Sequence, residues 1–208
     1  MYSNTIRESL AAWANFYQIT GEAAATLTGL QFIVQTLFGS NAMRPMSGGD
    51  TEGGIAAFGT PTVVHFALAL LLSAMLCAPW PEYDSLRLTL GVLGACASGY
   101  SIIVLRRARS QRTYSPTAYD WVWHILIPVT AYAAILSAAI FLPRDVERWQ
   151  FVIAAATLVV LCVGIHNAWD SVTYLSIHAM RRSYAATLVT SPPPPATTEL
   201  DESPGADG

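Results

Sequence analysis

Three histidines fall inside long apolar stretches of the sequence, and they are the side chains best suited to chemistry. His65 lies about one helical turn into the second stretch, His124 about one turn into the fourth, and His166 near the end of the fifth. Ionisable groups are costly in lipid, so by default they mark a functional site. Together with Gln31 and Gln35 of the first stretch, these histidines are expected to lie at a similar depth on four helices.

The fifth stretch adds a polar ridge that starts at His166. Asp170, Tyr174 and His178 follow at intervals of four residues, so they share one helix face, and Asn167 lies beside them. An Asp one turn from a His can hold the second ring nitrogen, which sets the tautomer and the basicity of the ring. This pattern is typical of a histidine that binds a metal or of one link in a proton relay.

Three interpretations stay open for the polar cluster, which we define as His65, His124, His166, Asp170, Gln31 and Gln35. The histidines could converge on a metal or a haem iron, since imidazole is the usual ligand for such ions. They could instead line a path for protons or a solute. The third interpretation places each ring at the headgroup level, half in water and hydrogen-bonded to a neighbouring helix. No HExxH motif, paired-Cys motif or closely spaced His pair strengthens the metal hypothesis, so no cofactor is predicted.

The remaining reactive side chains indicate no catalysis. No Ser/His/Asp arrangement, phosphate-binding loop or Cys/His dyad is visible, so we predict no catalytic residue and no enzyme. Glu22 is expected near the first turn of its span, where the helix dipole stabilises a carboxylate. Cys77, Cys96 and Cys162 lie within apolar stretches and are predicted to be small, buried packing residues. No basic patch on a soluble face indicates nucleic acid as a partner.

Membrane helices are the elements that must position these groups. Of the 208 residues, 53% are hydrophobic and only 12% are charged, against about 25% charged in soluble proteins. Runs of roughly 17 to 25 apolar residues are long enough to cross a bilayer as helices, and the alternation of a barrel strand is missing. We therefore predict an all-α bundle of five transmembrane helices near residues 16–38, 62–80, 86–105, 121–142 and 151–169.

The predicted transmembrane domain covers residues 16–190. An interfacial segment, residues 1–15, precedes it, and a disordered, acidic, Pro-rich tail, residues 191–208, follows it. The Gly-rich connection over residues 39–59 is expected to move freely. Arginines cluster from Arg106 to Arg112, between the third and fourth spans, and Arg-rich loops stay in the cytoplasm. This rule predicts an outside N-terminus and a cytoplasmic C-terminus.

Small residues four apart form a strip on two of the predicted helices. The strips consist of Gly21, Ala25 and Gly29 and of Gly91, Ala95 and Gly99. Such strips let helix backbones approach closely, so the two could pack on each other. A contact between subunits, or a site for a ligand or lipid, is the alternative. Pro128 is expected to kink the fourth span, and Pro143 to end it.

Two sequence elements carry a family resemblance. The run from Trp13 to Val34, WANFYQITGEAAATLTGLQFIV, places an aromatic pair before the pattern GxAAAxLxGLxF. It resembles the start of a family of small bacterial proteins that cross the inner membrane several times, and GIHNAWD, from Gly164 to Asp170, is similar to a second shared element. The resemblance implies a helical inner-membrane protein; some members of that family are labelled as modulators of a membrane protease. It carries over no catalytic residue.

These observations predict a multi-pass protein of the bacterial inner membrane that acts without catalysis as an interaction or regulatory component. Its expected partners are the lipid bilayer and another membrane protein or a second copy of the chain. The alternative is a transporter or channel subunit that uses the polar cluster. A haem- or metal-binding redox protein is the third hypothesis.

Overall fold

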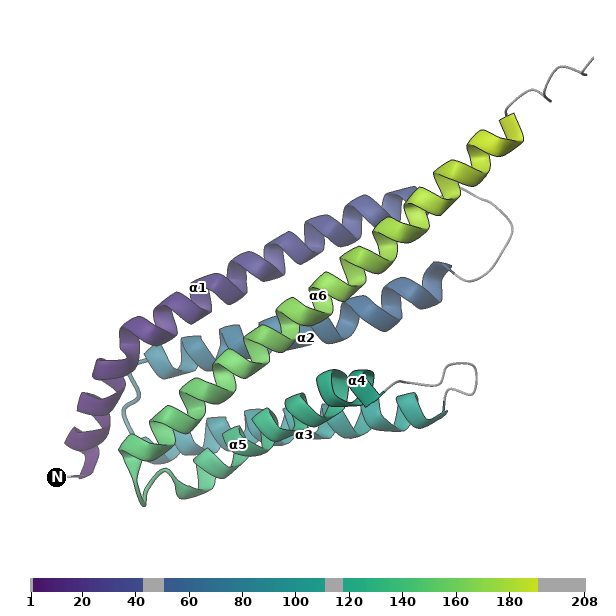
Figure 1. The fold of residues 1–208 in the computed structure, drawn as a ribbon. Coiled ribbons are helices and arrows are strands. Elements are labelled where there is room, and N and C mark those ends of the chain that lie inside the picture. Colours follow the sequence, from purple (N-terminus) through teal and green to yellow (C-terminus); the bar gives the residue numbers. More distant parts are fainter. Residues whose placement is uncertain (1, 43–50, 111–117, 191–208) are drawn as a thin grey trace, which may run out of the picture. The chain divides into compact units, whose positions relative to one another are not determined.

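The computed structural model describes residues 2–42, 51–110 and 118–190, and each regular element in these ranges is a helix (Figure 1). The prediction of an all-α chain is confirmed. In chain order the elements are α1 (Tyr2–Ala42), α2 (Thr51–Cys77), α3 (Tyr83–Ser110), α4 (Ala118–Trp121), the π-helical turn η1 (Val122–Leu126), α5 (Ile127–Phe141) and α6 (Val146–Thr190). The chain divides into two units at Thr173, and the packing described below lies within the first unit.

Among the described residues, three helical segments are long and apolar enough to cross a membrane. They are Tyr83–Arg106, Val122–Phe141 and Val146–Thr173. The described apolar part of α2, Pro61–Cys77, is shorter. α1 does not reach the same apolar character because Gln18, Glu22 and Gln31 interrupt its hydrophobic residues. The described residues therefore contain three helices that could cross a membrane, and the five-span topology stays a prediction.

The ends of α1 and α2 differ from the expected boundaries. α1 begins at Tyr2, so the segment predicted as interfacial, residues 1–15, continues into the same helix. Glu22 consequently lies about five turns inside α1, and the prediction that the dipole of a first turn stabilises it is wrong. The connection predicted over residues 39–59 is helical at both ends, since α1 runs to Ala42 and α2 starts at Thr51. The rest of that connection, and the tail from residue 191, lie outside the described residues.

The turn from α5 to α6 follows from local chemistry. Pro143 cannot donate a helical hydrogen bond, and α5 ends at Phe141 just before it, as predicted. The Asp145 Oδ1 atom accepts a hydrogen bond from the Arg148 backbone N–H at 3.0 Å, so Asp145 caps the start of α6. The Phe141 and Trp149 rings stack with centroids 5.5 Å apart across the turn. The two longest apolar segments of the second half of the chain are thus joined as a tight hairpin.

The core lies where α2, α5 and α6 face one another, with α1 along α2 and α3 along α5. Two close approaches require glycine. A Cβ on Gly164 of α6 would lie 2.5 Å from the Phe66 ring of α2, and one on Gly94 of α3 would lie 2.9 Å from the Leu136 backbone nitrogen of α5. The largest fully buried side chains come from all five long helices: Tyr17, Tyr132, Phe66, Leu72, Leu76, Leu86, Leu90, Ile135, Leu142, Ile153, Gln150 and Val160.

Candidate functional site

His166 of α6 is held by two polar side chains on the same ring nitrogen. Its Nε2 atom lies 3.2 Å from Asp170 Oδ2, one turn further along α6, and 3.4 Å from the Tyr119 hydroxyl of α4. A carboxylate only accepts hydrogen bonds, so we assign the proton to Nε2. In the neutral ring this leaves the lone pair on Nδ1, so the pairing with Asp170 selects the tautomer of His166.

Aromatic side chains fix the orientation of the same ring. The Trp123 indole stacks on His166 with centroids 4.1 Å apart and planes at 26°. Tyr119 lies against both rings, with its centroid 5.7 Å from that of His166 and 6.2 Å from that of Trp123. His166 is therefore positioned by its own helix and by the two short elements that precede α5.

His124 is presented by a helical irregularity that Pro128 explains. Pro128 has no backbone N–H, so the His124 carbonyl cannot receive its usual hydrogen bond, and the proline ring crowds that carbonyl. The backbone responds with the π-helical turn η1, in which the Ile127 N–H donates to the Val122 carbonyl, five residues back. This turn carries His124 to a ring-centroid distance of 6.5 Å from His166. The kink predicted for Pro128 takes this specific form.

His65 of α2 is the buried member of the group, with 3% of its surface exposed. Its Nδ1 atom donates to the Pro61 carbonyl one turn earlier, which leaves Nε2 as an acceptor in the neutral ring. The ring stacks on Tyr132 of α5 with centroids 6.1 Å apart.

Several buried polar atoms around these rings have no hydrogen-bond partner within the described part of the chain. They are His65 Nε2, the Tyr132 hydroxyl and Asn167 Oδ1, from three different helices. An unsatisfied buried polar group costs about 1 to 3 kcal/mol, which is why such groups ordinarily bind water or a ligand. Gln31 of α1 is also buried, and Gln35 is half-buried. Of the predicted polar cluster, the structure brings His124, His166 and Asp170 together, whereas the printed ring contact of His65 is with Tyr132 and Gln31 and Gln35 lie on α1.

Other predicted features of the site are either outside the described side chains or differ from the prediction. The side chains of Tyr174 and His178 lie outside the described residues, so the ridge is seen only as far as Asp170. No group of three or more His, Cys, Asp or Glu side chains that could hold a metal ion occurs in the described ranges. The prediction of buried cysteines is wrong, because Cys77, Cys96 and Cys162 are all exposed, although the Cys77 thiol still reaches the Ala14 carbonyl of α1 at 3.6 Å.

Two buried polar contacts were missing from the sequence predictions. The Tyr17 hydroxyl of α1 donates to Gln150 Oε1 of α6 at 3.2 Å, and the Thr20 and Ser73 hydroxyls lie 3.0 Å apart between α1 and α2. The burial of Gln150 follows from its position on α6. Buried residues on α6 recur at intervals of three and four, and the series contains Gln150, Ile153, Thr157, Val160, Gly164, Asn167 and Ser171. Gln150 therefore lies on the same buried face as Asn167.

The two strips of small residues pack on different helices. Gly21 faces Ser73 of α2, where an added Cβ would lie 3.0 Å from the Ser73 Cβ, and Gly91 faces Ala139 of α5 at 3.7 Å. Neither glycine faces the other strip. Gly29 and Gly99 have open space around them, and Ala25 and Ala95 are exposed. Two of the three residues in each strip are thus exposed or have open space around them within the described residues.

One face of α1 is exposed along five turns, and we name it the α1 seam. Its residues recur at intervals of three and four, and all are exposed: Asn15, Gln18, Glu22, Ala25, Gly29, Ile33 and Thr36. Gln18 Nε2 donates to Glu22 Oε1 at 3.1 Å, so the two polar side chains form a pair on the surface of the helix. The seam combines a carboxylate and an amide with small residues, which is unlike a face that contacts only lipid.

No protein-family model, curated protein or solved structure matches this chain. The resemblance of Trp13–Val34 and Gly164–Asp170 to a bacterial membrane family therefore stays a prediction.

Proposed function

We propose that this chain is a five-span protein of the bacterial inner membrane that acts without catalysis by holding another membrane protein against the α1 seam. α1 has 41 residues and is about 60 Å long, more than the roughly 30 Å of a hydrocarbon core. Of the polar residues that lower its apolar character, Gln31 lies in the interior, and Gln18 and Glu22 lie on the seam. A helix that contacts protein on two faces needs less apolar character to cross a bilayer than one surrounded by lipid.

The observation that carries this proposal is the exposed Glu22 in the middle of α1. A carboxylate and an amide facing lipid are costly, and the cost disappears when a second helix supplies a hydrogen-bond donor. Ala25 and Gly29 follow within two turns and would let that helix approach closely. The partner is therefore expected to be a transmembrane helix with small residues and a basic or amide side chain at the level of Glu22.

Photo-crosslinking in intact membranes tests this function. A crosslinker placed at Ala25 is expected to capture a membrane protein, and Gly29→Leu is expected to abolish the product. Gly99→Leu is the matched control, because Gly99 of α3 also has open space around it and lies off the seam. The mass of the product separates a different protein from a second copy of the chain. Crosslinks to lipid alone, unchanged by Gly29→Leu, would contradict the proposal.

A second candidate function is a path for protons or a small polar solute along the polar cluster. The unsatisfied His65 Nε2, Tyr132 hydroxyl and Asn167 Oδ1 atoms favour it, since they could pass a proton or hydrogen-bond a solute. Flux in liposomes that falls in a His166→Ala variant would support this candidate. Iron or another metal in the purified protein would support the third hypothesis, a haem or metal redox protein.

A further inference from the structure

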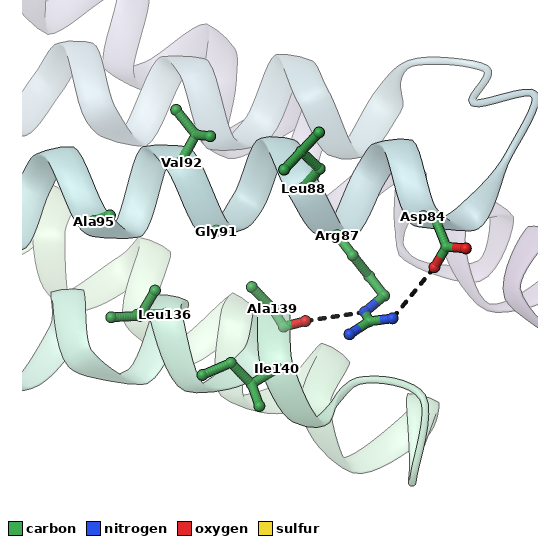
Figure 2. A pocket seen from close by; sticks show the side chains of 9 residues that line it. All are labelled: Asp84, Arg87, Leu88, Gly91, Val92, Ala95, Leu136, Ala139 and Ile140. Carbon is green, nitrogen blue, oxygen red and sulfur yellow. Dashed lines mark hydrogen bonds and ion pairs between the residues drawn. The ribbon is translucent and has the colours of Figure 1, made fainter.

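A groove about 520 Å³ in volume runs between α3 and α5 on a face separate from the polar cluster (Figure 2). Gly91 and Ala95 of α3 form its floor, and Leu88, Val92 and Ile140 form its walls. Leu88 is 69% exposed and Ile140 is 56% exposed, so the walls project from the surface and are not covered by another helix among the described residues. The groove is apolar along most of its length.

One end of the groove carries a pair of opposite charges. Arg87 Nη1 lies 3.2 Å from Asp84 Oδ1, and Arg87 Nε donates to the Ala139 carbonyl at 3.1 Å (Figure 2). A guanidinium has five N–H donors, so donors remain on Arg87 after these two contacts. The Asp84 side chain is 85% exposed, which leaves its carboxylate open to a cation. Both signs of charge are thus offered within one turn of the start of α3.

From this order of charge and apolar surface, we propose that the groove binds a phospholipid with an ethanolamine headgroup. The lipid phosphate pairs with Arg87, whose planar fork suits phosphate, and the ammonium pairs with Asp84. An acyl chain then lies on Gly91 and Ala95, which extend about 12 Å along α3 from Arg87. α3 crosses the membrane, and Trp80 and Tyr83 just before Arg87 are residues typical of the interface, so the charged pair lies at headgroup depth.

A phospholipid fits these observations better than another helix. A helix docked in the groove would cover Arg87 and Asp84 and would need to match both charges at one level. A zwitterionic lipid carries a phosphate and an ammonium on adjacent groups and continues as a hydrocarbon chain, which is the order the groove presents. An anionic lipid such as phosphatidylglycerol matches Arg87 but supplies no cation for Asp84.

Native mass spectrometry of the delipidated, full-length protein in detergent tests the proposal. Phosphatidylethanolamine is expected to bind with one-to-one stoichiometry and about three-fold more tightly than phosphatidylglycerol with the same acyl chains. Asp84→Asn should remove that preference without removing binding. Ala95→Leu should block the floor of the groove and reduce binding of both lipids about ten-fold. Ala95 is exposed, so the larger side chain leaves the core intact.

Ala155→Leu is the matched control, because Ala155 is an exposed alanine on α6, away from the groove. The inference is overturned if Ala95→Leu and Ala155→Leu retain lipid equally, or if wild type and Asp84→Asn show the same ratio of the two lipids. A dimer that Ala95→Leu dissociates would also overturn it and would assign the groove to a second copy of the chain. None of these outcomes depends on the α1 seam, so the two proposals fail independently.

Discussion

The Nε atom of Arg87 donates to the Ala139 carbonyl, and this is the carbonyl that Pro143 leaves without a helical donor. In a continuous helix the amide four residues after Ala139 would satisfy it, but a proline has no N–H. A side chain from α3 therefore completes the last turn of α5. Pro143, which ends α5, thus leaves a carbonyl unsatisfied, and the hydrogen bond from Arg87 to that carbonyl joins α3 to α5 at this end.

Arg87→Met is expected to lower the stability of the folded protein by about 1 to 3 kcal/mol, because it leaves the Ala139 carbonyl unsatisfied. The measurement is thermal unfolding of the purified protein in detergent. Pro143→Ala restores a backbone N–H, so Arg87→Met should cost less in that background. An equal loss of stability in both backgrounds would show that Arg87 does not stabilise the protein through the Ala139 carbonyl.

Tyr17→Phe is expected to destabilise the contact between α1 and α6. It removes the donor to Gln150 Oε1 in a buried position where both side chains are fully covered. Replacing one partner leaves a buried polar group unsatisfied, at about 1 to 3 kcal/mol, whereas replacing both can be nearly neutral. The Tyr17→Phe, Gln150→Met double variant should therefore unfold at a higher temperature than Tyr17→Phe alone. A double variant that is less stable would point to a role for Gln150 beyond this hydrogen bond.

Gly164→Ala is expected to destabilise the protein, although alanine in a helix is ordinarily more favourable than glycine by about 1 kcal/mol. The added Cβ would overlap the Phe66 ring, which is buried and cannot move away freely. Phe66→Leu should reduce the penalty. Gly99→Ala provides the comparison, because open space surrounds Gly99 and only the helix preference applies. The prediction is wrong if the two substitutions shift the unfolding temperature in the same direction.

Pro128→Ala is expected to convert η1 into regular α-helix, since the His124 carbonyl regains a donor. Loss of the π turn rotates the preceding residues by roughly 100° about the helix axis and moves Trp123 off His166. The fluorescence of Trp123 is obtained by subtracting the spectrum of a Trp123→Phe variant. His166→Ala should change this fluorescence when Pro128 is present and leave it unchanged in the Pro128→Ala background. A response of equal size in Pro128→Ala would show that the stacking does not depend on the π turn.

The helical character of the chain follows directly from its composition, and three apolar segments overlap the predicted spans 86–105, 121–142 and 151–169. Hydropathy predicts the topology around α1 less well, because Gln18, Glu22 and Gln31 lower the apolar character of the helix although they lie on two different faces. Hydropathy averages over the whole circumference of a helix and does not separate those faces. The period of three and four along α1 does separate them, once burial shows which face is covered.

The histidines could be placed by counting residues from the ends of the spans, and His124 does lie beside His166. The partners that hold the rings could not be inferred in that way. Tyr119 and Trp123 look like ordinary interfacial aromatics, and they reach His166 through a π turn whose geometry depends on Pro128. Gln150 was overlooked because one amide next to an interfacial tryptophan carries no motif. Its burial depends on the register of α6 against α1.

The apolar layer between the Tyr17–Gln150 pair and the histidines has an electrical consequence. Leu72, Ile153 and Val160 are completely buried there, and the Phe66 ring is pressed against Gly164. An ion that entered this layer would lose its hydration shell and meet few polar groups in return. We therefore expect the close packing of Phe66 against Gly164 to insulate one polar level from the other.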